Sequence, residues 1–126
     1  KWECFIRTQR SDRTGIPRGK LPQDTPVTFT GEANAQNLID TWRKRLCYQA
    51  SPETRQYAED FKAALHETEP ELSNALVPNC VYRGGCPELE TCRYWYWLDM
   101  TPDASIADRY AQYNALFYER RKGQNA

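Results

Sequence analysis

The chain has 126 residues, which is enough for one domain with a modest core and too few for two ordinary domains. Its 17 Lys and Arg residues balance 17 Asp and Glu residues, so no overall charge favours nucleic acid or an anionic membrane. No stretch approaches the roughly 18 consecutive apolar residues of a membrane span. Any selectivity for charged ligands therefore has to come from a local arrangement of side chains.

Five cysteines are an odd number, which argues against a closed disulfide framework. We therefore expect reduced thiols and a cytoplasmic protein, in the host cytoplasm if the source is viral. The sequence begins with Lys1 rather than methionine. We expect residues 1–126 to form a single domain that is a fragment, a processed product or the ordered part of a longer polypeptide.

The N-terminal part, residues 1–26, is predicted to be rich in loops. Residues 9–26, "QRSDRTGIPRGKLPQDTP", contain three prolines and two glycines among charged side chains, which is typical of turns. The segment "VTFT", residues 27–30, alternates apolar and polar side chains and predicts a short, half-buried strand. Gly31 then allows the chain to turn.

A helix is predicted to begin at Asn34 and to end near Arg45. Its apolar residues recur at helical spacing and should face the core, while a separate polar stripe faces away. The apolar stripe consists of Ala35, Leu38, Ile39, Trp42 and Leu46, and the polar stripe of Asn34, Asn37, Thr41 and Arg45.

Two further helices follow. Ser51, Pro52 and Glu53 form a typical helix start, and Pro70 prevents this second helix from continuing far beyond residue 68. The last helix should span residues 101–123 and place Ile106, Tyr110, Tyr113 and Phe117 inward. We predict an α+β, helix-dominated fold in which a short strand region packs on two long helices, with the C-terminal helix extending the core.

Between these helices lies a cysteine- and aromatic-rich segment, residues 80–100. Cys80, Cys86 and Cys92 are spaced C-x5-C-x5-C, whereas structural zinc usually takes a first pair two to four residues apart. A fourth ligand would have to be the distant Cys4 or Cys47. The pattern is compatible with a zinc or iron–sulfur site, but it favours buried free thiols and no metal.

The block "TGEANAQNLIDTWRKRLCYQASPETRQYA", residues 30–58, resembles the flavin-dependent thymidylate synthase (ThyX) family. Members of this family carry Asn-Ala-Arg, a helix ending in Leu-Arg, and then His-Ala-Gln-x-Glu-Ile-Arg at the start of the next helix. Without a gap, Asn34 matches the asparagine, Gln36 the first arginine and Arg45 the helix-end arginine. Residues 49–53, "QASPE", match His-Ala-Gln-x-Glu, and the resemblance covers the core block of about residues 15–70.

The resemblance implies a reaction and a substrate. The family converts dUMP to dTMP, or carries out a related one-carbon transfer to a pyrimidine nucleotide, with FAD, NADPH and methylene-tetrahydrofolate. Arg45 would polarise the uracil carbonyls of dUMP as a substrate-binding, catalytic residue. A guanidinium offers forked donors and stays charged, which suits an edge where negative charge develops. Arg18, in "GIPRGK", would bind the nucleotide phosphate.

The resemblance also implies a cofactor site and an assembly. Asn34, Gln36 and Asp40 would hold FAD, across a subunit interface of a homotetramer. Gln49 would take the place of the family histidine that contacts the flavin. Neither nucleic acid nor a membrane is implied as a partner.

The chain departs from the family in three respects. The Arg-His-Arg-x-x-Ser signature does not occur in these 126 residues, and Gln36 and Ser51 replace family arginine and glutamine. The only histidine, His66, is expected on a helix surface without a catalytic role. Two alternatives to an active synthase therefore remain open: a nucleotide- or flavin-binding module without turnover, and a metal-stabilised structural or interaction protein.

Overall fold

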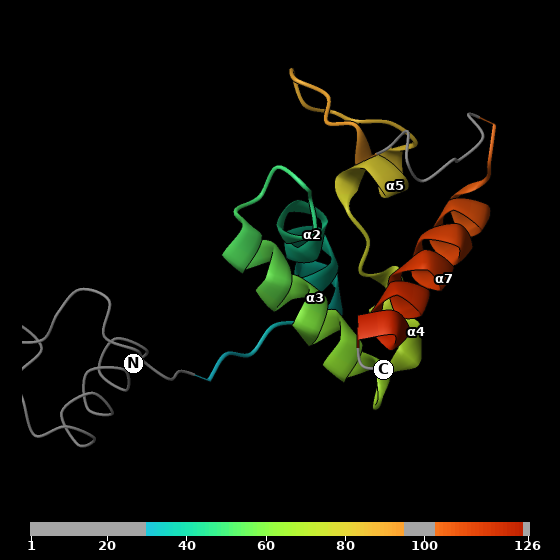
Figure 1. Cartoon of the computed structure of the whole chain (residues 1–126). Helices are drawn as coiled ribbons and strands as arrows, with labels where there is room; N and C mark the ends of the chain where they lie inside the picture. The colour runs from blue at the N-terminus through green and yellow to red at the C-terminus, as the bar shows by residue number, and fades with distance from the viewer. Residues whose placement is uncertain (1–29, 95–102, 125–126) are drawn as a thin grey trace, which may run out of the picture. The chain divides into compact units, whose positions relative to one another are not determined.

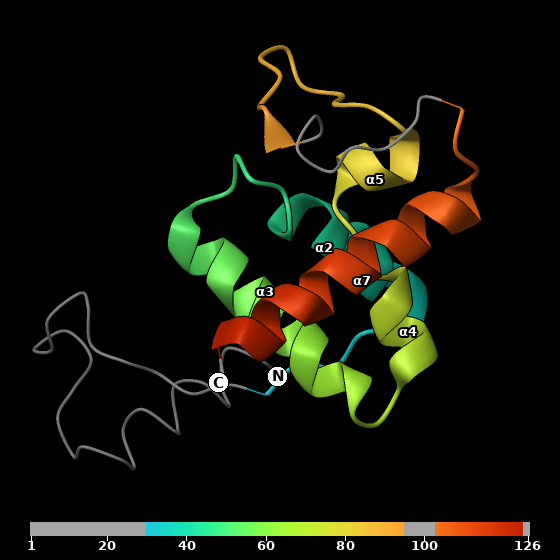
Figure 2. The same cartoon turned by 45° about the vertical axis from the view of Figure 1, so that its right-hand side comes forward.

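The computed structural model describes residues 30–94 and 103–124. The chain divides into two units, Lys1–Glu32 and Ala33–Ala126, and all the described helices belong to the second. Helices α2 to α5 follow one another through short links, α7 crosses α4, and α5 stands beside the N-terminal half of α7 (Figures 1 and 2). The helices are α2 (Ala35–Arg45), α3 (Pro52–His66), α4 (Pro70–Ala75), α5 (Asn79–Arg83) and α7 (Ile106–Gln124).

The expected dominance of helices is confirmed, whereas the β part of the predicted fold is not. Among residues 30–94 and 103–124 no strand occurs. The strand predicted for residues 27–30 lies outside the described residues except for Thr30, which belongs to no helix or strand. None of the described helices is long and apolar enough to cross a membrane.

Both helices of the predicted pair begin where their capping residues predict. The Asn34 side chain accepts a hydrogen bond from the backbone N–H of Asn37 at 2.8 Å. The Ser51 hydroxyl accepts one from the N–H of Thr54 at 3.3 Å, with Pro52 in the first turn of α3. Each cap satisfies an amide that has no partner inside the helix, so both starts are set by local sequence.

Helix α7 begins later than predicted. The backbone N–H of Asp108 donates to the Ser105 hydroxyl at 3.2 Å, so Ser105 caps a helix whose first residue is Ile106. At this end of α7 the Ile106 side chain is 53% exposed, and its prediction as a core residue is wrong. Tyr113 and Phe117, farther along, are buried as predicted.

One further expectation about buried side chains, that for Ala35, also needs correction. Ala35 is exposed because it occupies the first position of α2, before that helix reaches α3. Tyr57 is 61% exposed even though its ring lies 6.4 Å from that of Trp42, measured between centroids. Leu46, Ala58 and the half-buried Phe61 carry the packing of α2 on α3 instead.

In the part of the chain that the structure describes, the core consists of two apolar clusters joined by the link between α4 and α5. Leu76 at the end of α4 has an extended backbone (φ −83°, ψ 97°), and successive side chains of an extended chain point to opposite sides. Leu76 accordingly packs into one cluster and Val77 into the other. The first cluster contains Leu46, Ala58 and Leu76, and the second contains Val77, Val81, Tyr113 and Phe117.

A buried lysine connects three helices. The Lys62 side chain of α3 has no exposed surface, and its ammonium donates to the Ser73 carbonyl at 2.6 Å and to Asn114 Oδ1 at 2.7 Å. The Ser73 hydroxyl donates back to the Lys62 carbonyl at 2.7 Å and lies 2.8 Å from the Tyr118 hydroxyl. Burial lowers the pKa of Lys62 to about 7.

Helix α5 is held against α7 by Arg109. Its guanidinium donates to the carbonyls of Val81 at 2.7 Å, Tyr82 at 2.9 Å and Ala104 at 2.7 Å. The contacts with Val81 and Tyr82 satisfy carbonyls at the end of α5, where the helix lacks internal donors, and the contact with Ala104 lies just before α7. Gly84 follows α5 with φ +77°, the left-handed conformation that ends many helices, and a Cβ there would lie 3.4 Å from Arg109 Cζ.

Lys62 gives the fold a testable pH dependence. Its folded pKa of about 7 lies below the ordinary value of 10.5, so the unfolded chain binds more protons between these values. We expect the free energy of unfolding to rise from pH 7 to pH 9, by up to about 1.4 kcal/mol per pH unit, and to be insensitive to this group at lower pH. Urea titrations across this range would measure the slope.

Lys62→Met should abolish this rise because methionine carries no titrating group, whereas Lys122→Met on the exposed last turn of α7 should keep it. An unchanged slope in the Lys62 variant would contradict the assignment.

Gly84→Ala should destabilise the fold by about 1–2 kcal/mol because alanine resists the left-handed conformation. The added methyl group would also meet the Arg109 guanidinium. Gly123→Ala is the matched control, since nothing lies within 4 Å of a Cβ placed there. Thermal unfolding of both variants would show whether the loss of stability is specific to position 84. Equal melting temperatures would contradict the role given to Gly84.

Candidate functional site

The elbow, residues 46–51 between α2 and α3, is held in a fixed geometry by the packing of the two helices. The Trp42 indole N–H donates to the Ala58 carbonyl at 3.1 Å, and its ring centroid lies 4.5 Å from that of Phe61. Leu46, directly after α2, is only 2% exposed. These contacts fix the direction of the last turn of α2, which carries three consecutive basic residues, Arg43, Lys44 and Arg45.

The cysteine loop, residues 84–94, lies against this elbow. The Gln49 side-chain amide donates to the Glu90 carbonyl, and the rings of Tyr48 and Tyr94 stack with centroids 3.9 Å apart. Tyr48 is itself fixed, because Arg55 lies over its ring at 4.2 Å and Arg120 donates to its hydroxyl at 3.0 Å. Two separate contacts thus bring the loop to the end of α2.

Elbow and loop enclose a cavity of about 370 Å³. Its wall combines three cationic side chains with one carboxylate, four thiols and two tyrosine rings. The lining residues are Arg43, Lys44, Arg45, Cys47, Tyr48, Gln49, Ala50, Asn79, Cys80, Cys86, Pro87, Glu88, Cys92 and Tyr94.

The three cationic side chains that line this cavity differ in the hydrogen bonds and ion pairs that they already form. Arg43 donates to Asp40 at 3.0 Å, lies 3.6 Å from the centroid of the Tyr82 ring and is half-buried. Lys44 and Arg45 are exposed and form no hydrogen bond or ion pair with any other residue of the described ranges. Two cations are therefore available to an anionic ligand, and Glu88 is the only carboxylate among the described residues of the wall.

Two of the predicted site residues, Arg45 and Gln49, meet in this cavity. Asn34, Gln36 and Asp40 do not line it. Asn34 and Gln36 lie at the other end of α2, about 16 Å away, and Asp40 lies at the middle of the helix. Arg18 lies outside the described residues. The structure therefore separates Arg45 from Asn34, Gln36 and Asp40 along one helix, whereas Gln49, which is also implied for the flavin, lies beside Arg45.

Three of the residues implied for FAD, Asn34, Gln36 and Asp40, lie on exposed surface of the first half of α2. Asn34 is occupied as the helix cap. Gln36 donates to Asp40 at 3.0 Å, and the same carboxylate oxygen pairs with Arg43. They present polar groups for a dinucleotide, but no other described residue encloses them, so they fit one edge of a flavin site rather than a whole one.

The contribution of Lys44 and of the cysteine loop to this cavity was not predicted from the sequence. The run "RKR" at residues 43–45 was a usable signal, since three cations in one helical turn point in different directions and some must face a ligand or solvent. No comparable signal existed for the loop, because its docking depends on Tyr48 and Gln49 meeting Tyr94 and Glu90 more than 40 residues later.

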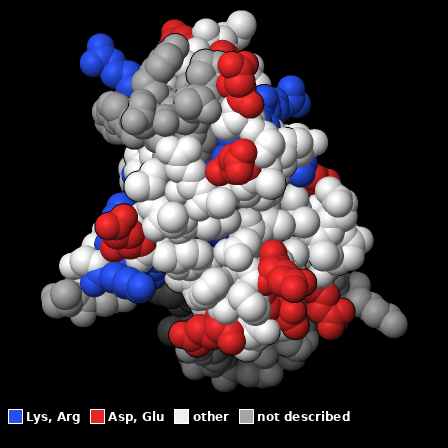
Figure 3. Space-filling model, turned by 90° about the vertical axis from the view of Figure 1, so that its right-hand side faces the viewer, with Lys and Arg blue, Asp and Glu red and all other residues white. Residues whose placement is uncertain are grey.

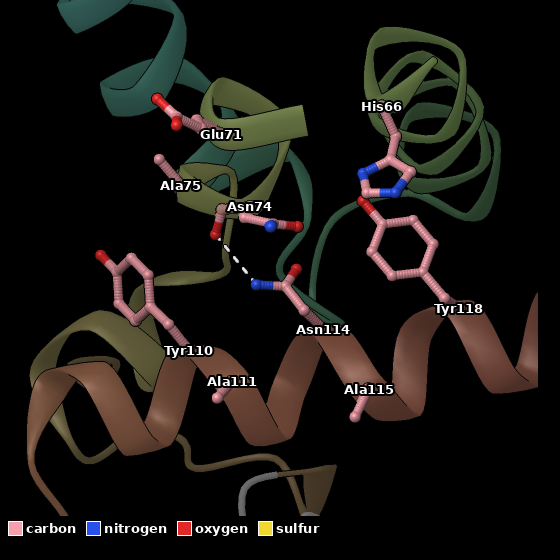
Figure 4. Close-up of a pocket in the computed structure, with 9 residues that line it drawn as sticks. All are labelled: His66, Glu71, Asn74, Ala75, Tyr110, Ala111, Asn114, Ala115 and Tyr118. Atoms are coloured by element: carbon pink, nitrogen blue, oxygen red, sulfur yellow. Dashed lines mark hydrogen bonds between the residues drawn. The ribbon is translucent and has the colours of Figure 1, made fainter. Parts of the chain in front are cut away.

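A second cavity of about 520 Å³ lies where α4 and the end of α3 face α7 (Figure 4). Its floor is made of alanines, with Tyr110 and Tyr118 at either end and the His66 ring 4.3 Å from that of Tyr118. The Asn114 amide is already bonded to the Asn74 carbonyl at 3.0 Å. Among the described residues no Lys or Arg lines this cavity, so they offer no such cation to a phosphate.

The molecular face that carries α7 is consistent with the lack of cations in this second cavity. Uncharged surface covers much of its middle, and carboxylates as well as Lys and Arg lie around this area (Figure 3). His66, expected on an exposed surface, is half-buried, and its Nδ1 atom is buried with no hydrogen-bond partner among the described residues. The elbow cavity, with its cations, is therefore the better candidate for binding an anionic small molecule.

The site is thus that of a helical protein with an arginine-bearing elbow and a small cationic cavity. The family model described as thymidylate synthase complementing protein matches residues 16–71, somewhat less than half of the chain. This match confirms the resemblance over a segment that contains α2, the elbow and α3. No curated protein and no solved structure matches the chain significantly.

Gln49→Ala should loosen the cysteine loop because it removes one of the two contacts that hold it. A hydrogen bond of about 1 kcal/mol corresponds to about fivefold faster amide hydrogen exchange in residues 86–92. Gln56→Ala is the matched control, since Gln56 is an exposed glutamine of α3 bonded to Asp60 at 3.0 Å. If both variants exchange alike, the Gln49 contact does not hold the loop.

Proposed function

We propose that this protein acts in flavin-dependent thymidylate synthesis and that the elbow cavity binds dUMP. Methylene-tetrahydrofolate would supply the one-carbon unit and NADPH the reducing equivalents. The observation that carries the proposal is a coincidence of position: the segment matched by the thymidylate synthase complementing family contains the elbow, whose cavity brings Arg45 and Gln49 together. A cytoplasmic setting goes with this proposal.

The chemistry of the cavity suits a pyrimidine mononucleotide. Lys44 and Arg45 are cations without partners in the described structure, and a nucleotide phosphate is an anion. The forked donors of Arg45 fit the carbonyl edge of uracil and favour negative charge that develops there. A volume of about 370 Å³ lies near the lower end of the roughly 300–1,000 Å³ of ligand cavities, which favours a mononucleotide over a dinucleotide.

FAD would lie along the exposed face of α2, held by Asn34, Gln36 and Asp40. When bound, it would accept hydride from NADPH and mediate the methylene transfer. Because these residues form only one edge of a site, a second copy of the chain would supply the opposite edge within a homotetramer. Gln49 would orient the flavin through its side-chain carbonyl, since its amide group is engaged by the loop.

A second function, nucleotide or flavin binding without turnover, is favoured by specific residues. Gln36 stands where the family has a charged arginine, and Ser51 is engaged as the cap of α3 where the family has a glutamine. The Arg-His-Arg-x-x-Ser signature is not among these 126 residues. A binding module would keep the elbow cavity and its cations but lack the groups needed for reaction.

Absorption spectroscopy tests the cofactor part of the proposal. The protein is saturated with FAD, passed through gel filtration, and its visible spectrum and size are recorded together. Retained oxidised-flavin bands on a tetrameric peak, followed by NADPH oxidation that depends on dUMP, would support the synthase. Retained flavin without turnover would favour the binding module, and a colourless protein would contradict both flavin-dependent versions.

Arg45→Ala should weaken dUMP binding about tenfold or more, because a hydrogen bond to a charged group contributes about 1.5–3 kcal/mol. Arg45→Lys should recover only part of this loss because an ammonium lacks the forked geometry. Arg83→Ala is the matched control, since Arg83 is an exposed arginine at the end of α5 that does not line the cavity. Calorimetric titration with dUMP measures all three, and equal affinities would contradict the role of Arg45.

A further inference from the structure

The guanidinium of Arg43 is only partly paired, a feature that the proposed function does not use. Its Nη1 group donates to Asp40 Oδ1 at 3.0 Å. Its Nε atom is buried and has no hydrogen-bond partner among the described residues. A buried N–H without a partner is unfavourable, because it has lost its bond to water and gained none in return. Such an orphaned donor indicates that the side chain has a second position in which this donor is used.

Arg43 lies where the elbow cavity meets two helices. It belongs to the last turn of α2 and lines the cavity. Its guanidinium carbon lies 3.6 Å from the centroid of the Tyr82 ring in α5. Asp40, three residues earlier in α2, accepts from Arg43 and from Gln36 through the same oxygen, each at 3.0 Å. An internal carboxylate therefore occupies a cation that stands in the wall of the proposed nucleotide cavity.

We propose that Arg43 is a third phosphate-binding residue of the elbow cavity and that Asp40 restrains it until a nucleotide binds. This inference rests on the proposed function, since it takes the ligand to be dUMP. The phosphate would displace the Asp40 carboxylate and accept from the Nε–H and Nη2–H groups of Arg43, the paired arrangement that guanidinium groups form with phosphates. Asp40 is thus an internal competitor of the ligand.

The phosphate is the part of the nucleotide that can compete with a carboxylate. A uracil carbonyl is uncharged, whereas a phosphate monoester carries a charge of about −1.5 to −2 near pH 7 and offers three acceptor oxygens. In the described ranges no group of three or more Cys, His, Asp or Glu side chains is close enough to hold a metal ion, while Arg43 and Lys44 follow one another in the cavity wall. These two cations would meet the phosphate, and Arg45 would remain for the base.

The exchange leaves no buried charge without a partner. The Asp40 side chain is 53% exposed, against 19% for that of Arg43. Once released, the carboxylate is solvated and keeps its hydrogen bond with Gln36. An ion pair with one partner this exposed contributes little to stability. Pairing the buried Nε–H with a phosphate oxygen removes an unfavourable group, so the phosphate is the stronger partner for Arg43.

The experiment is calorimetric titration of the 126-residue chain with dUMP, with and without the substitution Asp40→Asn. This change keeps the shape of the side chain and an acceptor for Gln36 but removes the charge that restrains Arg43. We expect dUMP to bind about two- to fivefold more tightly, the factor that corresponds to loss of an exposed ion pair. Removal of a merely structural contact would leave the affinity unchanged or lower it.

Asp60→Asn is the matched control. Asp60 is 55% exposed, accepts from Gln56 at 3.0 Å and pairs with Arg121 at 3.0 Å, so it repeats the surroundings of Asp40. None of these three residues lines the elbow cavity. The control removes the same charge and should leave dUMP affinity unchanged.

Two measurements test Arg43 itself. Arg43→Met should weaken dUMP binding about tenfold or more, since it removes hydrogen bonds to a charged group, and Asp40→Asn should have no further effect in this variant. In the unsubstituted chain, the Nε–H resonance of Arg43 should move downfield on saturation with dUMP, as expected for a donor that gains a partner. That of Arg121 should not move.

The outcomes separate this inference from the proposed function. Unchanged or weaker binding in the Asp40 variant, an equal gain in the Asp60 variant, or an Arg43 resonance that does not move would overturn the inference. If dUMP binds and depends on Arg45 while Asp40→Asn has no effect, only this inference fails. If dUMP binds to none of the proteins, the proposed function fails together with it.

Discussion

The fold depends on how the buried ammonium of Lys62 is satisfied. A charged or polar group without access to water must find partners within the protein, because leaving it unpaired costs about 1–3 kcal/mol or more. Lys62 finds them in the Ser73 carbonyl and the Asn114 side chain, which belong to α4 and α7. One side chain of α3 therefore determines where two other helices lie, and the aromatic rings of α7 close over it.

The position of the elbow follows from that arrangement. Helix α7, fixed at Asn114, continues to Arg120, which pairs with Glu59 at 2.8 Å and donates to the Tyr48 hydroxyl at 3.0 Å. Tyr48 is in turn the residue on which Tyr94 of the cysteine loop stacks. A continuous series of contacts thus leads from the buried lysine to the cavity that contains Arg45. These contacts support the walls of a small ligand site. In the described part of the chain no β-sheet lies beneath it.

Local sequence patterns predicted α2 and α3 well. Asn34, Ser51 and Pro52 act through neighbours in the chain, and the spacing of Leu38, Trp42 and Leu46 reflects a stripe that faces one other helix. The short helices α4 and α5 were not predicted, since each has too few residues to show a period.

The candidate site was predictable only in part. The resemblance identified Arg45 and Gln49, and the structure brings them together. Lys62 could not be recognised as buried from the sequence, because lysine at a helical position is normally solvated and its partners lie 11 and 52 residues away. The gathering of Cys47 with the other three cysteines likewise depends on contacts between distant segments, which no spacing rule describes.

The central claim is that the elbow, rather than the alanine-floored cavity of α4 and α7, receives the nucleotide. Backbone amide chemical shifts recorded by NMR during titration with dUMP test it most directly, because they locate the ligand without a substitution. We expect shifts concentrated at residues 43–50 and in the cysteine loop, with little change around Asn74, Tyr110 and Asn114. Shifts concentrated around those three residues, or no saturable shifts at all, would contradict the claim.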